Sequence, residues 1–373
     1  MVSYMNILVT GAEGFIGKNL VVRLNELEVF NVITYVRDET ECSLKAKLSD
    51  ADVVIHLAGE NRPLSKDGFR QGNFELTNRL CSFMSDIDEK LPLIMTSSVQ
   101  ASLDNPYGAS KLAAEKSVQN MANIHGNPVM IYRLPGVFGK WCKPNYNSVV
   151  ATFCSNIANG LPIEVHDAQH LLNLVYIDDV ISSILDVLGS KFSQGVSRNV
   201  ISPEYSITIG ELAKTIEGFK HSRDTLVSDR VGSGLMRALY ATYLSYLSTS
   251  EFAYPLIGHV DKRGMFVEML KTQDSGQFSF FTAHPGITRG GHYHHTKSEK
   301  FLVVKGKADF GFRHISSGET YRIQTSDKQP RVVETIPGWT HDITNIGNDL
   351  MIVMLWANEI FDRENPDTIA SRV

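Results

Sequence analysis

The chain has 373 residues, which favours two domains, each long enough to bury a core. Hydrophobic residues make up 43% and charged residues 21%, with 28 glycines and 13 prolines, so the composition excludes an extended disordered or low-complexity protein. The net charge of -5 argues against a protein that coats nucleic acid.

Cysteine usage and apolar runs point to a cytoplasmic protein. Cys42, Cys81, Cys142 and Cys154 have neither zinc-finger spacing nor the density of a disulfide framework, so we expect a reducing compartment. The apolar runs at residues 5–10 and 350–357 are too short for a signal sequence or a membrane span. We therefore expect neither a nucleic-acid partner nor a membrane partner.

The first predicted unit is a strand, a glycine-rich turn and a helix. Residues 6–10 are rich in strand formers, residues 11–17 read GAEGFIG, and apolar residues recur at helical spacing over residues 16–27. This order places a pyrophosphate at a helix N-terminus, where glycines allow close approach of the backbone. The expected cofactor contacts are Gly11, Gly14, Phe15, Ile16 and Gly17.

The second predicted strand, residues 32–36, ends at Arg37 and Asp38. An acid at this position usually binds the ribose hydroxyls of NAD, whereas an arginine suits the 2′-phosphate of NADP. Arg37 therefore favours NADPH. Asp38 could instead be the acid that binds the ribose of NAD, if the strand ends one residue later. The other alternative is that Arg37 and Asp38 are an ordinary solvated charge pair.

A third strand within residues 51–59 ends in HLAG, where Leu57 and Ala58 are expected beside the cofactor. We interpret His56 as a packed histidine with a structural hydrogen bond. A helix is expected from Asn73 to about residue 87. Strands that alternate with helices in this way predict an α/β doubly wound parallel sheet.

A fourth strand, residues 93–96, leads to Ser98 and then to PYGASK at residues 106–111. Tyr107 and Lys111 are four residues apart, so they share one face of a helix. An ammonium beside a phenol lowers the tyrosine pKa toward a useful range for proton transfer, and the Ser98 hydroxyl can hold a substrate oxygen. The glycine turn, the serine strand and Tyr-x-x-x-Lys follow one another in the chain. This order favours a catalytic role for Tyr107 and Lys111 over a pair of helix residues without a function.

Residues 6 to about 250 resemble an extended short-chain dehydrogenase/reductase. The matching motifs are GAEGFIG, HLAG, TSS, PYGASK, RLPGVFG at residues 133–139 and YIDDV at residues 176–180. The resemblance implies a Rossmann-like fold and site residues Ser98, Tyr107 and Lys111 for catalysis, Lys111 again for the cofactor, and Asn73, Arg133, Lys143 and Asn145 for the substrate. A polar loop without a ligand is the alternative for residues 140–147.

The residue after Ser98 narrows the chemistry. Relatives that dehydrate hexoses carry an acid beside the catalytic serine or threonine, whereas here Val99 follows. Elimination of water is therefore disfavoured, and carbonyl reduction, oxidation or epimerisation remains.

The second domain is predicted to follow a helix within residues 229–250, which the segment ending at Pro255 breaks. We divide the chain into domains 1–252 and 253–373. The later pattern predicts turns at residues 274–276 and 316–318 and short strands at residues 265–271, 276–282, 300–305, 308–314, 320–323, 331–336 and 350–356. Many short strands with almost no helix imply an all-β barrel.

Residues 286–306 fit the metal-site pattern Gly-x5-His-x-His-x4-Glu-x6-Gly. His292 and His294 face one way on a strand, Glu299 can return to them across a turn, and a tight turn presents His341. Three imidazoles and one carboxylate leave positions open for a substrate, and a non-redox role points to zinc among zinc, manganese, iron and nickel. Satisfied histidines in a sheet are the alternative. His295 faces the opposite way and is expected at the surface.

With this pattern, residues 256–373 resemble a cupin. Residues 288–293 also resemble the Arg-Gly-x-His segment of cupin sugar-nucleotide epimerases, which implies that Arg289 contacts a substrate phosphate. His292 cannot be both a metal ligand and a free base. Either the metal is the Lewis acid or His292 is the base of a metal-free site, and we favour the metal because the ligand set is complete.

The whole chain resembles the bifunctional enzymes of capsular-polysaccharide and O-antigen synthesis that join an extended reductase to a metal cupin. The resemblance implies a homodimer whose cupin epimerises C3 of a UDP-linked 4-keto-6-deoxy-N-acetylhexosamine. The reductase would then reduce C4 with NADPH to give UDP-2-acetamido-2,6-dideoxy-L-talose. Two alternatives stay open: a single-activity sugar reductase or epimerase whose cupin only binds ligand or dimerises, and a non-enzymatic NADP sensor.

Overall fold

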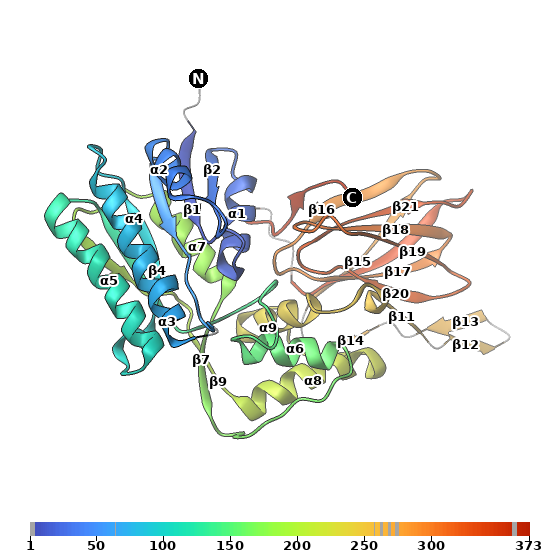
Figure 1. Cartoon of the computed structure of the whole chain (residues 1–373). Helices are drawn as coiled ribbons and strands as arrows, with labels where there is room; N and C mark the ends of the chain where they lie inside the picture. The colour runs from blue at the N-terminus through green and yellow to red at the C-terminus, as the bar shows by residue number, and fades with distance from the viewer. Residues whose placement is uncertain are drawn as a thin grey trace. The chain divides into compact units, whose positions relative to one another are not determined.

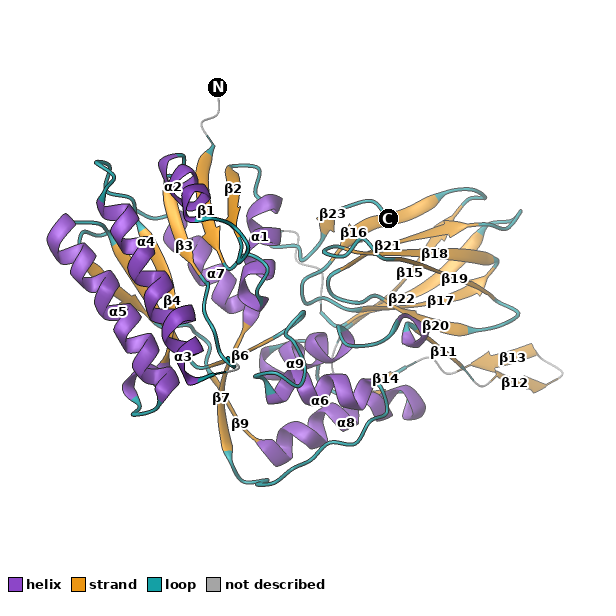
Figure 2. Cartoon of the chain, in the orientation of Figure 1, coloured by secondary structure: helices purple, strands orange, loops and turns teal. Residues whose placement is uncertain are grey.

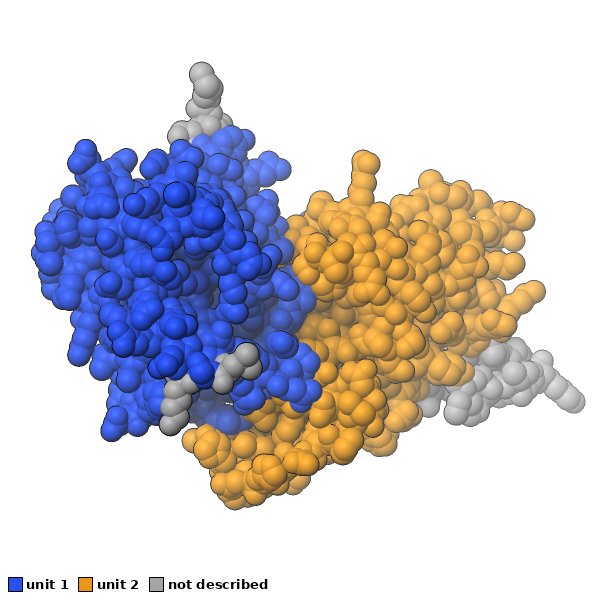
Figure 3. Space-filling view, in the orientation of Figure 1, with its two compact units in different colours: residues 1–148, 172–206 blue, residues 149–171, 207–373 orange. Residues whose placement is uncertain are grey.

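The structure is a computed structural model that describes residues 4–63, 65–256, 258–261, 264–267, 270–272, 276–359 and 364–373. The chain forms two compact units, residues 1–148 with 172–206 and residues 149–171 with 207–373 (Figure 3). The second unit thus includes helices that precede residue 252. The boundary between domains 1–252 and 253–373 stays a prediction.

The first unit is built on a six-stranded parallel sheet in the order β2-β1-β3-β4-β5-β8. Its strands are β1 (Met5–Thr10), β2 (Phe30–Tyr35), β3 (Val53–His56), β4 (Leu93–Ser98), β5 (Val129–Leu134) and β8 (Val196–Asn199). Strands β3 and β4 are buried along their whole length, as in a sheet covered on both faces. The predicted doubly wound parallel sheet is confirmed.

Helices cover both faces of this sheet (Figure 1). Helices α2 (Glu41–Ser49), α4 (Leu76–Ser85) and α5 (Pro106–His125) lie on one face, and α1 (Phe15–Glu26) and α7 (Ile177–Leu188) lie on the other. Leu80 and Val118 of the first group pack in one core with Leu8 and Val54 of the strands. The helical segment predicted from Asn73 begins earlier, with α3 (Lys66–Phe69) and a π-helical stretch (Arg70–Glu75) before α4.

The second unit contains α6 (Val149–Ala158), α8 (Ile209–Thr225) and α9 (Gly234–Leu244) together with two five-stranded antiparallel sheets (Figure 2). One sheet has the order β11-β20-β17-β22-β15 and the other β19-β18-β21-β16-β23. The strands are β11 (Ala253–Pro255), β15 (Gln277–Ala283), β16 (Thr288–Tyr293), β17 (Glu299–Lys305), β18 (Lys307–His314), β19 (Thr320–Ser326), β20 (Arg331–Glu334), β21 (Trp339–Asn345), β22 (Met351–Ala357) and β23 (Ile369–Ala370).

Smaller elements complete the described chain. They are β6 (Gly136–Phe138), β7 (Leu171–Tyr176), β9 (Tyr205–Thr208), β10 (Val227–Ser228), β12 (Gly258–Asp261), β13 (Gly264–Val267), β14 (Lys271–Thr272) and the 3-10 turns Val99–Ser102 and Thr249–Glu251. Within the described residues, no helix is both long enough and apolar enough to cross a membrane.

The two antiparallel sheets share an apolar core. The ring of Phe301 on β17 lies 5.8 Å from that of Phe310 on β18, and Phe252 lies 5.3 Å from Phe312. Antiparallel sheets are thus confirmed, whereas a closed cupin barrel stays a prediction. The helix predicted within residues 229–250 is observed as α9, which spans Gly234–Leu244.

Six predicted strands, beginning at residues 276, 300, 308, 320, 331 and 350, match observed strands to within three residues. Sequence reasoning missed strand β21, which carries His341. Residues 268–269 of the predicted strand 265–271 and residues 274–275 of the predicted turn lie outside the described residues.

Candidate active site and metal centre

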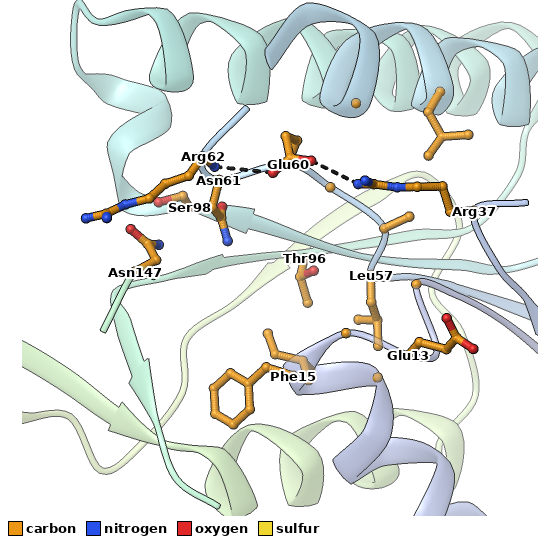
Figure 4. Close-up of a pocket in the computed structure, with 18 of the residues that line it drawn as sticks. Glu13, Phe15, Arg37, Leu57, Glu60, Asn61, Arg62, Thr96, Ser98 and Asn147 are labelled. Atoms are coloured by element: carbon orange, nitrogen blue, oxygen red, sulfur yellow. Dashed lines mark hydrogen bonds and ion pairs between the residues drawn. The ribbon is translucent and has the colours of Figure 1, made fainter. Parts of the chain in front are cut away.

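A cavity of about 1660 Å³ opens at the carboxyl ends of the parallel strands of the first unit (Figure 4). Its lining includes the glycine turn after β1, residues 57–59 after β3, Ser98 at the end of β4, and Tyr107 and Lys111 of α5. Strand β1 lies between β2 and β3, so the chain runs from β1 to one side to form β2 and then crosses to the other side of β1 to form β3. Ligands of doubly wound sheets bind at such a switch point.

The glycine turn forms a cradle that side chains would fill. Gly11 has a φ of 71°, and a Cβ there would lie 2.6 Å from the backbone nitrogen of Ala58. A Cβ on Gly17 would lie 2.1 Å from the Gly11 carbonyl oxygen. Helix α1 begins after Gly14, which offers no side-chain cap, so its first N–H groups are available to a phosphate. The residues present therefore fit a dinucleotide cofactor.

Arg37 lines the cavity, but its guanidinium already has an anionic partner. Its Nη2 lies 2.9 Å from Oε2 of Glu60 (Figure 4). Tyr146 donates its hydroxyl proton to Oε1 of the same carboxylate over 2.7 Å. Sequence reasoning missed Glu60 and Tyr146. The sequence signal that could have indicated Glu60 is an acidic residue directly after HLAG.

Helix α5 positions the tyrosine and the lysine. Its N-cap Asn105 accepts a hydrogen bond from the Gly108 N–H over 2.8 Å, and Pro106 starts the helix, so Tyr107 and Lys111 occupy its first turns. Lys111 is buried and donates to the Thr96 carbonyl oxygen over 3.3 Å. Burial lowers the pKa of Lys111 to about 8.

The expected effect of Lys111 on the tyrosine is absent from this structure. Burial raises the pKa of Tyr107, and only the hydrogen bond with Ser98 opposes it. The prediction of a lowered tyrosine pKa is therefore wrong for the protein without its cofactor, because the ammonium is directed to a backbone carbonyl and burial dominates.

Of the predicted substrate residues in the first unit, some line the cavity and others only hold the elements around it. Lys143 lines the cavity, whereas Arg133, Asn73 and Asn145 do not belong to its lining. Arg133 makes a two-pronged contact with the buried carboxylate of Glu115, with Nη2 2.7 Å from Oε2. That contact anchors β5 to α5, which is a supporting position.

Asn73 supports the loop that carries Glu60. Its Oδ1 accepts the Glu60 N–H over 2.9 Å, and its Nδ2 donates to the Glu60 carbonyl oxygen and to Ser110 Oγ, each over 3.0 Å. His56 is buried, with Nδ1 2.7 Å from Thr10 Oγ1 and Nε2 2.8 Å from Thr77 Oγ1. Its interpretation as a packed, hydrogen-bonded histidine is confirmed.

In the second unit the structure brings His292, His294, Glu299 and His341 together. One ligand atom from each lies within 4.8 Å of the others. His292 on β16 and His341 on β21 are cross-strand partners, His294 follows β16 and Glu299 begins β17. Oε2 of Glu299 lies 3.1 Å from His294 Nε2 and 3.4 Å from His341 Nε2.

The electrostatics of this cluster suit a divalent metal. Burial, with the neighbouring His341 and His294, lowers the pKa of His292 to about 3, which keeps its imidazole neutral with a free lone pair. Burial would raise the pKa of Glu299, but its bonds to His294 and His341 hold it well below its usual range. Nδ1 of buried His341 has no hydrogen-bond partner within the described part of the chain. Three nitrogens and one carboxylate oxygen form a fitting donor set for zinc.

His295 is not at the surface, so that prediction is wrong. It is buried, and its ring lies 5.5 Å from that of Tyr293. The loop that carries it is held inward because the Asp367 carboxylate accepts hydrogen bonds from the N–H groups of residues 295–297. Asp367 lies more than seventy residues away, so no local pattern indicated it.

Arg289, the predicted phosphate contact, is exposed on β16. Its Nη1 donates to the Thr282 carbonyl oxygen over 3.2 Å, and its guanidinium lies 5.1 Å from the centre of the Phe281 ring.

Comparison with known proteins identifies both parts of the chain. Residues 7–200 match the NAD dependent epimerase/dehydratase family, and residues 259–369 match the polysaccharide biosynthesis C-terminal domain. The chain is 53% identical over 369 residues to the UDP-2-acetamido-2,6-beta-L-arabino-hexul-4-ose reductase of Pseudomonas aeruginosa, covering 99% of each chain.

Solved structures agree. The capsular polysaccharide assembling protein CapF from Staphylococcus aureus is 40% identical, with a TM-score of 0.67 over 99% of this chain and 100% of that chain. The NAD complex of UDP-glucuronic acid 4-epimerase from Bacillus cereus, 21% identical with a TM-score of 0.53 over 58% of this chain and 84% of that chain, shares the fold. The chain therefore belongs to the NAD dependent epimerase/dehydratase family, with a polysaccharide biosynthesis C-terminal domain joined to it.

Proposed function

We propose that this protein is a bifunctional nucleotide-sugar enzyme. Its C-terminal metal site epimerises C3 of a UDP-linked 4-keto-6-deoxy-N-acetylhexosamine, and its first unit reduces the C4 ketone with NADPH to UDP-2-acetamido-2,6-dideoxy-L-talose. The observation that carries the proposal is the presence in one chain of a cavity lined by Ser98, Tyr107 and Lys111 and of a cluster with the donor set of a metal site. The name of the Pseudomonas aeruginosa relative supports the reductase half.

In the reductase half, bound NADPH supplies the hydride to C4. Ser98 holds the ketone oxygen, and Tyr107 gives its proton to that oxygen as negative charge develops. A phenol whose pKa is raised by burial keeps its proton until the developing alkoxide takes it. Lys111, a buried cation at the same cavity, stabilises the phenolate that remains and holds the cofactor ribose.

In the epimerase half, the C4 ketone acidifies the hydrogen on C3, so that removing and returning a proton inverts this carbon. A divalent metal, when bound, polarises the ketone oxygen and stabilises its negative charge. His292, His294, Glu299 and His341 would hold that metal. Because His292 is then a ligand, another group transfers the proton. Arg289 is proposed to contact the UDP phosphate.

The two activities form a logical sequence. Epimerisation next to a ketone is reversible, whereas reduction removes the ketone and with it the acidity of C3. Reduction therefore traps the new configuration, which gives a chemical reason for joining the two sites in one chain. A cytoplasmic location, expected from the cysteine usage, and a homodimer, implied by the family resemblance, belong to the same proposal.

A reductase alone is the second candidate. The name of the Pseudomonas aeruginosa relative mentions only reduction, which favours a cluster that binds ligand without turnover. The two candidates differ in one observable, the exchange of the C3 hydrogen with solvent in the absence of NADPH.

The deciding experiment is to incubate the full chain with a UDP-4-keto-6-deoxy-N-acetylhexosamine in D2O, with and without NADPH, and to follow it by NMR. We expect deuterium at C3 without NADPH and a single reduced product with it. Tyr107→Phe should abolish NADPH oxidation and preserve exchange, whereas His294→Ala should lower both metal content and exchange. Loss of exchange in Tyr107→Phe would refute the division of labour, and unchanged exchange in His294→Ala would refute the assignment of epimerisation to the histidine cluster. A wild-type chain that shows no exchange without NADPH would leave the reductase as the only activity.

A further inference from the structure

Residues 367–372 lie along the strand that carries the first predicted metal ligand. Strand β23 pairs with β16, with Ala370 opposite His292 and Ile369 opposite Tyr293. The Ser371 N–H donates to the Gly291 carbonyl oxygen over 2.8 Å. Arg313, on β18 of the same sheet, donates to Ser371 Oγ over 2.9 Å and to the Arg372 carbonyl oxygen. The segment is thus fixed along the edge of one sheet.

Asp367 makes the contacts that reach the ligands, through both its side chain and its backbone. The carboxylate accepts hydrogen bonds from the N–H groups of His295 over 2.8 Å and of Thr296 and Lys297 over 2.7 Å each. It also accepts one from Thr296 Oγ1 over 3.1 Å. The Asp367 backbone carbonyl oxygen accepts a hydrogen bond from His294 Nδ1.

The backbone contact sets the orientation of His294 and decides which ring nitrogen can bind a metal. A carbonyl oxygen only accepts, so Nδ1 carries a proton and Nε2 is the nitrogen left to bind a metal. Nε2 lies 3.1 Å from Glu299 Oε2 inside the cluster. The ring therefore presents Nε2 to the point where the four donor atoms converge.

The side-chain contacts fix the loop between two of the four donors. Residues 295–298 join His294 to Glu299, and three consecutive N–H groups of this loop converge on one carboxylate. Thr368 adds a link because Lys297 Nζ donates to its Oγ1 over 3.1 Å, while the same ammonium lies 3.5 Å from Glu299 Oε1. Asn358 holds the other end of the loop through the Ser298 N–H, so Asp367 and Thr368 fix the part that follows His294.

We propose that Asp367 is the positioning residue of the metal centre. Its backbone carbonyl directs His294 Nε2 at the metal, and its carboxylate fixes the loop that sets the distance from His294 to Glu299. This inference rests on the proposed metal site and adds a residue far from the ligand motif. Outer-shell partners of this kind typically change metal affinity about 10- to 100-fold when they are removed.

The test uses the full-length chain, stripped of metal by dialysis against a chelator and titrated with Zn²⁺ alone in competition with a chromogenic chelator. Asp367→Ala keeps the backbone carbonyl that bonds His294 and removes the carboxylate that holds the loop. It should weaken zinc binding about 10- to 100-fold, and the visible absorption bands of the Co²⁺-loaded protein should change with the coordination geometry. Asp367→Asn keeps one carbonyl oxygen for the loop N–H groups and should give an intermediate affinity. The Asp367→Asn variant also tests the proposal if the alanine variant does not fold.

Ser371→Ala is the matched control, because it removes one hydrogen bond of the same segment, from Arg313 to Ser371 Oγ, and leaves all contacts of Asp367 in place. It should bind zinc as the wild type does. Thermal melting of the metal-free proteins distinguishes a positioning role of Asp367 from a merely structural one. A structural role would lower the melting temperature of the Asp367 variants and leave their zinc affinity and Co²⁺ spectrum unchanged.

Three results would overturn the inference. Unchanged zinc affinity and Co²⁺ spectrum in both Asp367 variants would do so whatever their melting temperatures, and so would an equal loss of affinity in Ser371→Ala. A wild-type chain that binds neither ion would overturn the proposed metal site as well, which distinguishes the two failures.

Discussion

Replacing Glu334 by glutamine should destabilise the second unit, because this carboxylate joins two buried cations. Glu334 Oε1 lies 2.7 Å from Lys300 Nζ, and its Oε2 accepts hydrogen bonds from Arg223 of α8. The side chains of Glu334 and Lys300 are each 2% exposed. Tyr254 adds its hydroxyl oxygen, 3.1 Å from the Lys300 ammonium. Glutamine keeps the shape and an acceptor oxygen but removes the charge.

The size of the effect follows from the pKa of Glu334. Burial alone would raise it, but Arg223 and Lys300 lower it from its ordinary value of 4.5 to about 2. That difference corresponds to roughly 3 kcal/mol of stability at neutral pH, similar to the roughly 3–5 kcal/mol for breaking a buried ion pair. The folded state binds this proton less readily than the unfolded state. The stabilisation is therefore fully present above pH 4.5 and is lost as the pH falls from 4.5 to 2.

Urea unfolding, followed by tryptophan fluorescence, is the assay, because Trp339 and Trp356 are buried in the second unit. Glu334→Gln should lose about 3 kcal/mol at pH 7, and the gap to the wild type should narrow as the pH falls from 4.5 toward 2. The matched control is Glu41→Gln, which breaks the exposed ion pair with Arg79 and should cost less than about 1 kcal/mol. A loss below about 1 kcal/mol in Glu334→Gln, or a gap independent of pH, would refute the reasoning.

Two further predictions concern the cofactor. Gly17→Ala places a Cβ 2.1 Å from the Gly11 carbonyl oxygen, so NADPH binding should weaken about tenfold or more. Fluorescence titration measures the affinity, and a wild-type value would show that the turn is not the phosphate cradle. Arg37→Ala should weaken NADPH binding more than NADH binding, because only NADPH carries the 2′-phosphate, and an equal loss for both cofactors would contradict this role of Arg37.

Short-range patterns in the sequence were enough to predict much of the fold and part of the site. The glycine turn, the four-residue spacing of Tyr107 and Lys111, and the His-x-His spacing of His292 and His294 each depend on the geometry of one helix, strand or turn. The structure brings together each of these groups. The parallel sheet followed similarly from short apolar strands that alternate with helices.

What the sequence did not indicate depends on contacts between distant residues. Glu60 meets Arg37 and Tyr146, and Arg133 pairs with Glu115, but neither contact has a fixed spacing along the chain. The raised pKa of Tyr107 reflects its burial in the folded unit, which a sequence motif does not contain. Asp367 contacts His294 and His295 from more than seventy residues away, and no local spacing encodes such a contact.

The buried ion pairs around Glu334 also limit how the chain can be divided and recombined. Arg223 lies before residue 252, whereas Glu334 and Lys300 lie after it, and Phe252 packs 5.0 Å from the ring of Trp339. Excision of the β-rich half as a cassette would strip Glu334 of one cation and expose that aromatic contact. An exchange of this half between homologous chains would therefore have to include helix α8 to keep the charges complementary.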